Sequence, residues 1–122
     1  MPKNQTVYEV TNFHEANVAI DKIFDYFDAN ENLELSLDPT WIEAMLETEN
    51  NIIDYYQEII IADEDQPYYD EAIKLVSEAM KNIDAGLSQL SDENAFVEAD
   101  FCLHKAFESI LKINNFYEDR DK

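Results

Sequence analysis

The sequence predicts an all-α fold, an antiparallel four-helix bundle with a short extended N-terminal arm, in a single domain of residues 1–122. Apolar residues recur at steps of three and four in four separate stretches, which is the spacing of one face of an α-helix. One Gly and three Pro in 122 residues leave little material for turns, and this favours few long elements over many short strands. Short links between the last three stretches make neighbouring helices antiparallel.

The first predicted helix covers about residues 12–29. Asn12 followed by Glu15 is typical of a capping box, in which both side chains bond backbone N–H groups at the start of a helix. The apolar face of this helix is formed by Phe13, Ala16, Ile20, Ile23 and Phe27.

The second predicted helix covers about residues 38–62, with Asp38 as its cap and Pro39 in its first turn. Its wide apolar face contains Ile42, Met45, Leu46, Ile52, Ile53, Tyr56, Ile59 and Ile60. Glu49 falls within this face, where an ionised carboxylate is costly unless it is paired. Either the bundle opens there, or a neighbouring Lys or Tyr hydroxyl pairs with the carboxylate, or Glu49 titrates or contacts a partner.

The third and fourth predicted helices cover about residues 67–90 and 92–117. Pro67 opens the third, whose apolar stripe is Tyr69, Ile73, Val76, Met80, Ile83, Leu87 and Leu90. Ser91 and the two acids after it are typical of the cap and first turn of the fourth. The main stripe of the fourth helix is Phe96, Ala99, Leu103, Ala106, Ile110, Ile113 and Tyr117.

The fourth helix also carries a second apolar row, on the side away from its main stripe. The row consists of Val97, Phe101, His104 and Leu111. An exposed apolar patch of that size usually has a partner. Residues 3–10 are predicted to form the extended arm, because their apolar residues have no partners at helical spacing. Either this arm covers the row, or the row is the interface of a homodimer.

No constellation of residues indicates catalysis, a cofactor or a bound metal ion. Asp28, Asn30, Asn32, Glu34 and Ser36 alternate like the ligands of an EF-hand, but Leu33 replaces the glycine of the sharp turn and Pro39 the bidentate glutamate. His14 and His104 are far apart in the sequence and are not accompanied by the further Cys or His ligands that a zinc site needs. A single glycine leaves no phosphate-binding loop. We therefore expect a protein that is not an enzyme.

The start of the chain has no apolar signal region, and no run approaches the roughly 18 apolar residues of a membrane span. Cys102 is the only cysteine, which fits a reducing compartment. We expect a soluble cytoplasmic protein that does not bind membranes.

Charge is the most unusual feature of the chain. Residues 23–73 contain fifteen Asp and Glu but no Lys, Arg or His, in a chain of net charge −20. A surface of one sign repels itself and attracts cationic partners. Such a surface also repels the phosphates of nucleic acid, so we expect no direct binding to nucleic acid.

The acidic residues are predicted to form one composite partner-binding surface. On the second helix Glu43, Glu47, Asp54 and Glu58 lie within about 60° of one another, opposite the apolar face. The first helix, the link and the turn before the third helix add Asp21, Asp25, Asp28, Glu31, Glu34, Asp63, Glu64 and Asp65. Tyr55 and Tyr56 are included because tyrosines supply binding energy at protein interfaces. Two adjacent helices are needed, because carboxylates one turn apart are about 6 Å apart whereas duplex DNA carries a charge every 1.7 Å or so.

These features favour a small acidic inhibitor that acts as a DNA mimic on the basic nucleic-acid-binding surface of another protein. In size, acidity and helicity the chain resembles DNA-mimic proteins of phages and bacteria, including anti-restriction and anti-CRISPR inhibitors. That resemblance is compositional and involves no motif. One alternative is an immunity protein or chaperone that neutralises a basic toxin or effector through a tyrosine-centred footprint. Another is a structural oligomer assembled through the second row of the fourth helix.

Overall fold

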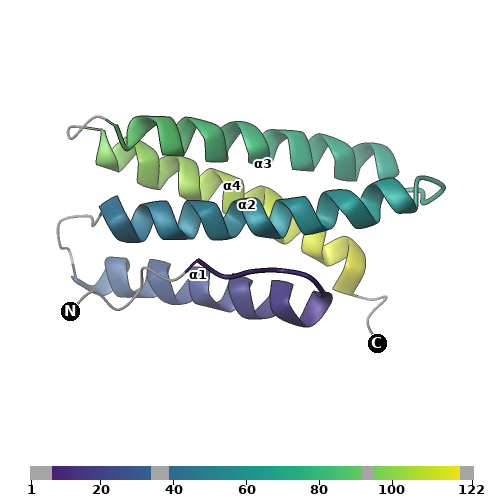
Figure 1. Cartoon of the computed structure of the whole chain (residues 1–122), viewed down its shortest axis with the longest axis horizontal. Helices are drawn as coiled ribbons and strands as arrows, with labels where there is room; N and C mark the ends of the chain where they lie inside the picture. The colour runs from purple at the N-terminus through teal and green to yellow at the C-terminus, as the bar shows by residue number, and fades with distance from the viewer. Residues whose placement is uncertain (1–6, 34–38, 92–94, 119–122) are drawn as a thin grey trace.

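The computed structural model describes residues 7–33, 39–91 and 95–118, and these form four helices without any strand (Figure 1). The helices are α1 (Phe13–Leu33), α2 (Pro39–Ala62), α3 (Tyr69–Gln89) and α4 (Phe96–Glu118). They run alternately in opposite directions along a common axis (Figure 1). The predicted antiparallel four-helix bundle is therefore confirmed.

The core lies between the four helices and is formed by the stripes that the sequence indicates. Ile23 of α1, Ile53 of α2, Ile83 of α3 and Ile110 of α4 are all fully buried. Together with their neighbours they form one hydrophobic cluster to which every helix contributes. Removal of this apolar surface from water is the main force that holds the bundle together.

The helix ends differ in part from the prediction. At the start of α1 the side chain of Asn12 accepts a hydrogen bond from the N–H of Glu15 at 2.8 Å, as predicted. The carboxylate of Glu15, however, accepts bonds from the N–H and the hydroxyl of Thr11, both at 2.7 Å, which lowers its pKa. Asp38, the predicted cap of the second helix, lies outside the described residues.

The link between α3 and α4 corrects a predicted boundary. Ser91 was expected to cap the fourth helix, but its N–H and hydroxyl both donate to the carbonyl oxygen of Ser88, at 3.3 Å and 3.0 Å. It therefore terminates α3, and α4 begins at Phe96. A serine can bond backbone groups on either side of it, so the local sequence does not decide which helix it caps.

Helix α3 approaches its neighbours closely at the single glycine. A Cβ atom added to Gly86 would lie 3.0 Å from both Cδ atoms of Leu46 on α2 and 3.2 Å from Cβ of Cys102 on α4. Helix α1, by contrast, reaches α4 through large aromatic rings, since Phe24 and Phe27 both contact Phe107. No helix of the described residues is both long and apolar enough to cross a membrane.

The described residues of the predicted arm, 7–10, are not helical and pair with α2. The N–H of Tyr8 donates to the hydroxyl of Thr48 at 3.1 Å, and the side-chain amide of Asn51 donates to the carbonyl oxygen of Tyr8 at 2.9 Å. The buried Thr48 hydroxyl in turn donates to the carbonyl oxygen of Ala44. These bonds fix this stretch of backbone beside α2.

Candidate interaction surface

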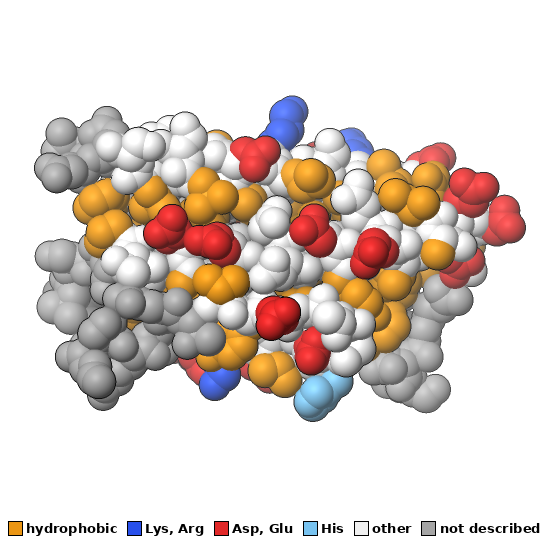
Figure 2. All heavy atoms as spheres, in the orientation of Figure 1, with side chains coloured by type: hydrophobic (Ala, Val, Ile, Leu, Met, Phe, Trp, Pro, Cys, Tyr) orange, Lys and Arg blue, Asp and Glu red, His pale blue; other side chains and the backbone are white. Residues whose placement is uncertain are grey.

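Four carboxylates form a row along α2, which we call the acidic row: Glu43, Glu47, Asp54 and Glu58. All four are exposed, because they lie opposite the residues that α2 buries in the core. Figure 2 shows red side chains along this helix on the face in view, with blue ones only toward the edges. At 1.5 Å per residue the row extends over about 22 Å.

The N-terminal segment adds a carboxylate that sequence reasoning did not include. Glu9 is exposed and, together with Asp54, Tyr55 and Glu58, lines a shallow groove of about 210 Å³ between this segment and α2. Glu9 was missed because it lies outside the cation-free stretch and nothing local indicates where the segment packs. The hydrogen bonds of the Tyr8 backbone, one donated to Thr48 and one accepted from Asn51, place the segment beside α2.

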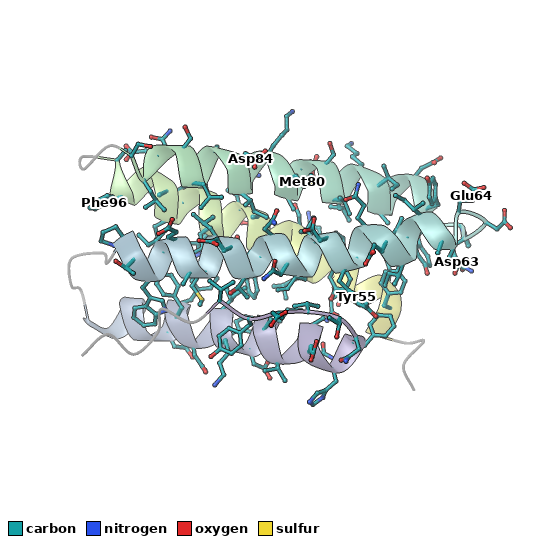
Figure 3. All side chains as sticks on the ribbon, viewed as in Figure 1. Tyr55, Asp63, Glu64, Met80, Asp84 and Phe96 are labelled. Atoms are coloured by element: carbon teal, nitrogen blue, oxygen red, sulfur yellow. The ribbon has the colours of Figure 1, made fainter. Side chains whose placement is uncertain are left out.

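The turn from α2 to α3 extends the acidic surface at one end of the bundle. Glu64 and Asp65 are exposed, whereas Asp63 is half-buried. Figure 3 shows Asp63 and Glu64 at the end of α2, beyond Tyr55. All three predicted turn acids are therefore close to the end of the acidic row.

The acids of α1 do not join this surface, which corrects the predicted two-helix composite. Asp21, Asp25 and Asp28 are exposed. Asp21 and Asp28 lie one helical turn from Phe24, whose ring packs on Phe107 of α4, so these carboxylates border the α4 side of α1 and not the α2 side. The spacing along α1 was correct, but the rotation of α1 against the bundle points its acids elsewhere. The side chain of Glu31 and all of Glu34 lie outside the described part of the chain.

Tyr56 was predicted to contact a partner, and this is wrong. Its side chain is fully buried, and its hydroxyl donates to Oδ1 of Asn114 on α4 at 2.8 Å. Burial raises the pKa of this phenol, with smaller contributions from Tyr55 and Tyr117. On the helical wheel Tyr56 belongs to the apolar face of α2. Its hydrogen bond to Asn114 therefore satisfies a buried hydroxyl within the core.

The aromatic residues near Tyr55 form a cluster that closes one end of the bundle. The Tyr55 ring meets Phe13 of α1 edge-on at 5.5 Å between centroids, and Phe13 lies 5.7 Å from Tyr117. Tyr68 stacks on Phe116 at 4.9 Å. Tyr55 is half-buried and borders the acidic groove (Figure 3). It is thus the one predicted interface tyrosine that retains access to a partner.

A buried polar group lies on the other side of α2. Glu49 is fully buried, and within the described residues neither of its carboxylate oxygens has a hydrogen-bond partner. Burial raises its pKa well above the ordinary value, and the charge of Asp100 raises it further. Of the alternatives that the sequence left open for Glu49, neither an opening of the bundle at this residue nor a pairing with a Lys or Tyr hydroxyl is found among the described residues. A protonated, neutral Glu49 is the form that the core accommodates.

The half-buried carboxylate of Asp100 has two side-chain partners. The phenol of Tyr26 donates to its Oδ1 at 2.7 Å, and Nε2 of His104 lies 3.4 Å from its Oδ2. Burial alone would raise the pKa of Asp100, but these two partners outweigh it and lower the pKa. Asp100 therefore remains ionised beside the neutral Glu49.

The second row of α4 is not covered by the described residues of the arm. Those residues pair with α2, while Val97 and Phe101 on α4 are 69% and 61% exposed. His104 stacks on Phe27 of α1 at 3.9 Å, and Leu111 is half-buried. The sequence left open whether the arm or a second subunit covers this row. The described residues of the arm do not cover it.

The described lysines are concentrated away from the acidic row. The five are Lys22, Lys74, Lys81, Lys105 and Lys112. The last three line a groove of about 400 Å³ between α3 and α4, together with Glu78 and Glu108. No group of three or more His, Cys, Asp or Glu side chains in the described ranges is arranged to hold a metal ion.

Comparisons of the chain with protein-family models, with curated proteins and with solved structures found no match.

Proposed function

We propose that the protein is a small acidic inhibitor that occupies the basic nucleic-acid-binding surface of another protein, as a DNA mimic. The observation that supports this most directly is the acidic row of α2, continued by Glu9 on one side and by the turn acids at its end. This surface is the contact site, and the protein acts by binding and not by catalysis.

Without the acids of α1, the charge spacing of the acidic row is too sparse for a duplex and is closer to that of one phosphate strand. The acidic row carries four charges over about 22 Å, whereas a single DNA strand carries about six over the same length. Glu9 and the turn acids Glu64 and Asp65 bring the total closer to that of a strand. The acids of α1 are directed elsewhere and do not contribute.

The burial of Tyr56 favours mimicry over the alternative of an immunity protein. A tyrosine-centred footprint needs aromatic rings that reach the partner, and only Tyr55 of the predicted pair is accessible, at the edge of the groove. Binding would therefore depend mainly on carboxylates. Such binding is fast and weakens as salt screens the charges.

The test uses two variants that remove equal charge from different faces. Glu47→Gln/Asp54→Asn/Glu58→Gln neutralises the acidic row, and Asp21→Asn/Asp25→Asn/Asp28→Asn neutralises α1. The immobilised protein captures proteins from host extract, and duplex DNA at constant ionic strength elutes them. We expect a nucleic-acid-binding protein that DNA displaces, and a loss of its affinity of at least about tenfold in the acidic-row variant, with a smaller loss in the α1 variant.

Equal losses in both variants would show that net charge and not the acidic row is recognised. If DNA displaces no captured protein, or if affinity is indifferent to salt, the proposal fails.

A further inference from the structure

The outward side of α4 carries two exposed apolar residues one helical turn apart. Val97 and Phe101 are more exposed than any other large apolar side chain in the described residues, at 69% and 61%. Phe24 of α1, which is 44% exposed, borders the same side because its ring packs edge-on against Phe107. We call Val97, Phe101 and Phe24 the α4 face. Exposed apolar surface of this kind usually marks an interface.

On one flank of α4, two exposed charges of opposite sign lie on either side of Phe101. Glu98 precedes Phe101 and Lys105 follows it, and both are exposed. They are seven residues apart, so they lie on the same flank of the helix, and Lys112 follows seven residues later. The Lys105 ammonium lies 5.7 Å from the centre of the Phe101 ring.

This arrangement is complementary to itself when a second α4 is turned end to end. In an antiparallel pair of helices, equal flanks face each other with reversed direction. A two-fold axis near Phe101 then brings Phe101 against Phe101 of the second copy and Glu98 opposite Lys105 of the second copy, twice. A parallel pair would bring like ends together and lose both charge pairs.

We propose that the α4 face is the interface of a homodimer in which two α4 helices pack antiparallel about a two-fold axis near Phe101. The remaining charge pattern explains why a second copy docks there. Three of the five described lysines line the groove beside this face, whereas the opposite side of the bundle carries the acidic row. Two molecules of net charge −20 repel each other less when the sides that carry these lysines meet than when their acidic rows meet.

The interface is isologous, so it closes at two copies. The α4 face lies across the bundle from the acidic row, because the row points away from the side of α2 that packs on α4. Both acidic rows of the dimer are therefore free, and the dimer presents two separate copies of the surface assigned above to a basic partner. The dimer itself does not depend on that proposed function.

The first experiment is sedimentation equilibrium of the purified full-length chain at about 0.15 M salt, over a range of concentrations. We expect a monomer–dimer equilibrium that Phe101→Glu weakens at least tenfold. Ile61→Glu is the matched control, since Ile61 is 52% exposed at the end of α2, away from the α4 face. It should leave the dimer unchanged. A wild-type monomer at every concentration, or equal effects of the two substitutions, would overturn the proposal.

The second experiment tests the antiparallel register by exchanging the two charges. Glu98→Lys alone places two cations opposite each other and should weaken the dimer, although it makes the chain less negative. Lys105→Glu alone should weaken it as well. The double variant should restore the wild-type dissociation constant to within about threefold. If Glu98→Lys strengthens the dimer, or the double variant fails to restore it, net charge governs association and the register is wrong.

The salt dependence of dimerisation should be opposite to that of partner binding at the acidic row. Screening reduces the repulsion between two strongly acidic molecules, so dimerisation should strengthen between about 0.05 M and 0.3 M salt. Binding of a basic partner to the acidic row should weaken over the same range. A dimer that dissociates as salt rises would contradict apolar packing as its driving force.

Discussion

The phenol of Tyr26 on α1 donates a 2.7 Å hydrogen bond to Oδ1 of Asp100 on α4, across 74 residues of sequence. The same tyrosine meets the Trp41 ring of α2 edge-on at 4.7 Å. One side chain thus ties α1 to two other helices. Because the acceptor is ionised and half-buried, this bond is stronger than one between neutral groups.

Loss of the Tyr26 hydroxyl should destabilise the bundle. Tyr26→Phe removes the bond and leaves the Asp100 carboxylate with less support, so we expect the free energy of unfolding to fall by about 1.5–3 kcal/mol. Urea denaturation measures the change. Glu108→Gln, an exposed change on α4, should have little effect, and an equally small effect of Tyr26→Phe would show that the bond contributes nothing net.

Glu49 should make the protein less stable as pH rises. Its pKa is raised by burial and by Asp100, so the folded state retains a proton that the unfolded chain releases above its ordinary value of 4.5. The contribution of Glu49 is fully present below pH 4.5 and is lost as pH rises through the folded pKa. The slope reaches about 1.4 kcal/mol per pH unit.

Glu49→Gln removes this titration. The free energy of unfolding of the variant relative to wild type should increase between about pH 5 and pH 8, as measured by urea denaturation at each pH. Glu47→Gln, on the exposed side of the same helix, should show a constant difference. A constant difference for Glu49→Gln as well would mean that the carboxylate titrates normally.

Asp100 has the opposite pH dependence. Its pKa is lowered, so its contribution is present above the ordinary value of 3.8 and is lost as pH falls through the folded pKa. We expect Asp100→Asn to reduce the stability of the protein at about pH 5 and to have a progressively smaller effect as pH falls below 3.8 and through the folded pKa, where wild-type Asp100 also takes up a proton. Thermal unfolding followed by circular dichroism measures both. An effect independent of pH would point to lost packing instead.

Tyr56 should matter for stability and not for recognition. Tyr56→Phe loses the bond to Asn114 and should cost about 1 kcal/mol, and Tyr56→Ala should cost about 3–5 kcal/mol through the cavity it leaves. Tyr55→Ala should cost less, because Tyr55 is only half-buried. Denaturant titrations rank the three variants. A folded Tyr56→Phe protein that lost its partner would instead place Tyr56 at the interface.

Moderate salt should raise the melting temperature, because it screens the self-repulsion of a chain of net charge −20. The melting temperature of the Phe101→Glu variant should rise as well, which separates screening within one molecule from salt-induced dimerisation. The Glu47→Gln/Asp54→Asn/Glu58→Gln variant should respond less. If salt leaves the wild-type melting temperature unchanged, the acids are already compensated locally.

The sequence by itself determined the four helices, their buried stripes and the acidic row of α2. Within a helix the direction of each side chain follows from local backbone geometry, so Glu43 and Glu58 had to lie opposite the buried Met45, and Glu49 had to lie beside it. The same geometry places Tyr56 on the apolar face of α2, and its complete burial assigns it to the core and not to the partner-binding surface.

Only the tertiary structure decided how these faces are combined. The direction of Asp21 and Asp28 relative to α2 depends on how Phe24 and Phe27 pack on α4, and the place of Glu9 depends on Thr48 and Asn51. Such contacts join segments that are far apart in the chain, and helical periodicity contains no information about them. The acidic surface is therefore built from α2, the N-terminal segment and a turn, and not from α1 and α2.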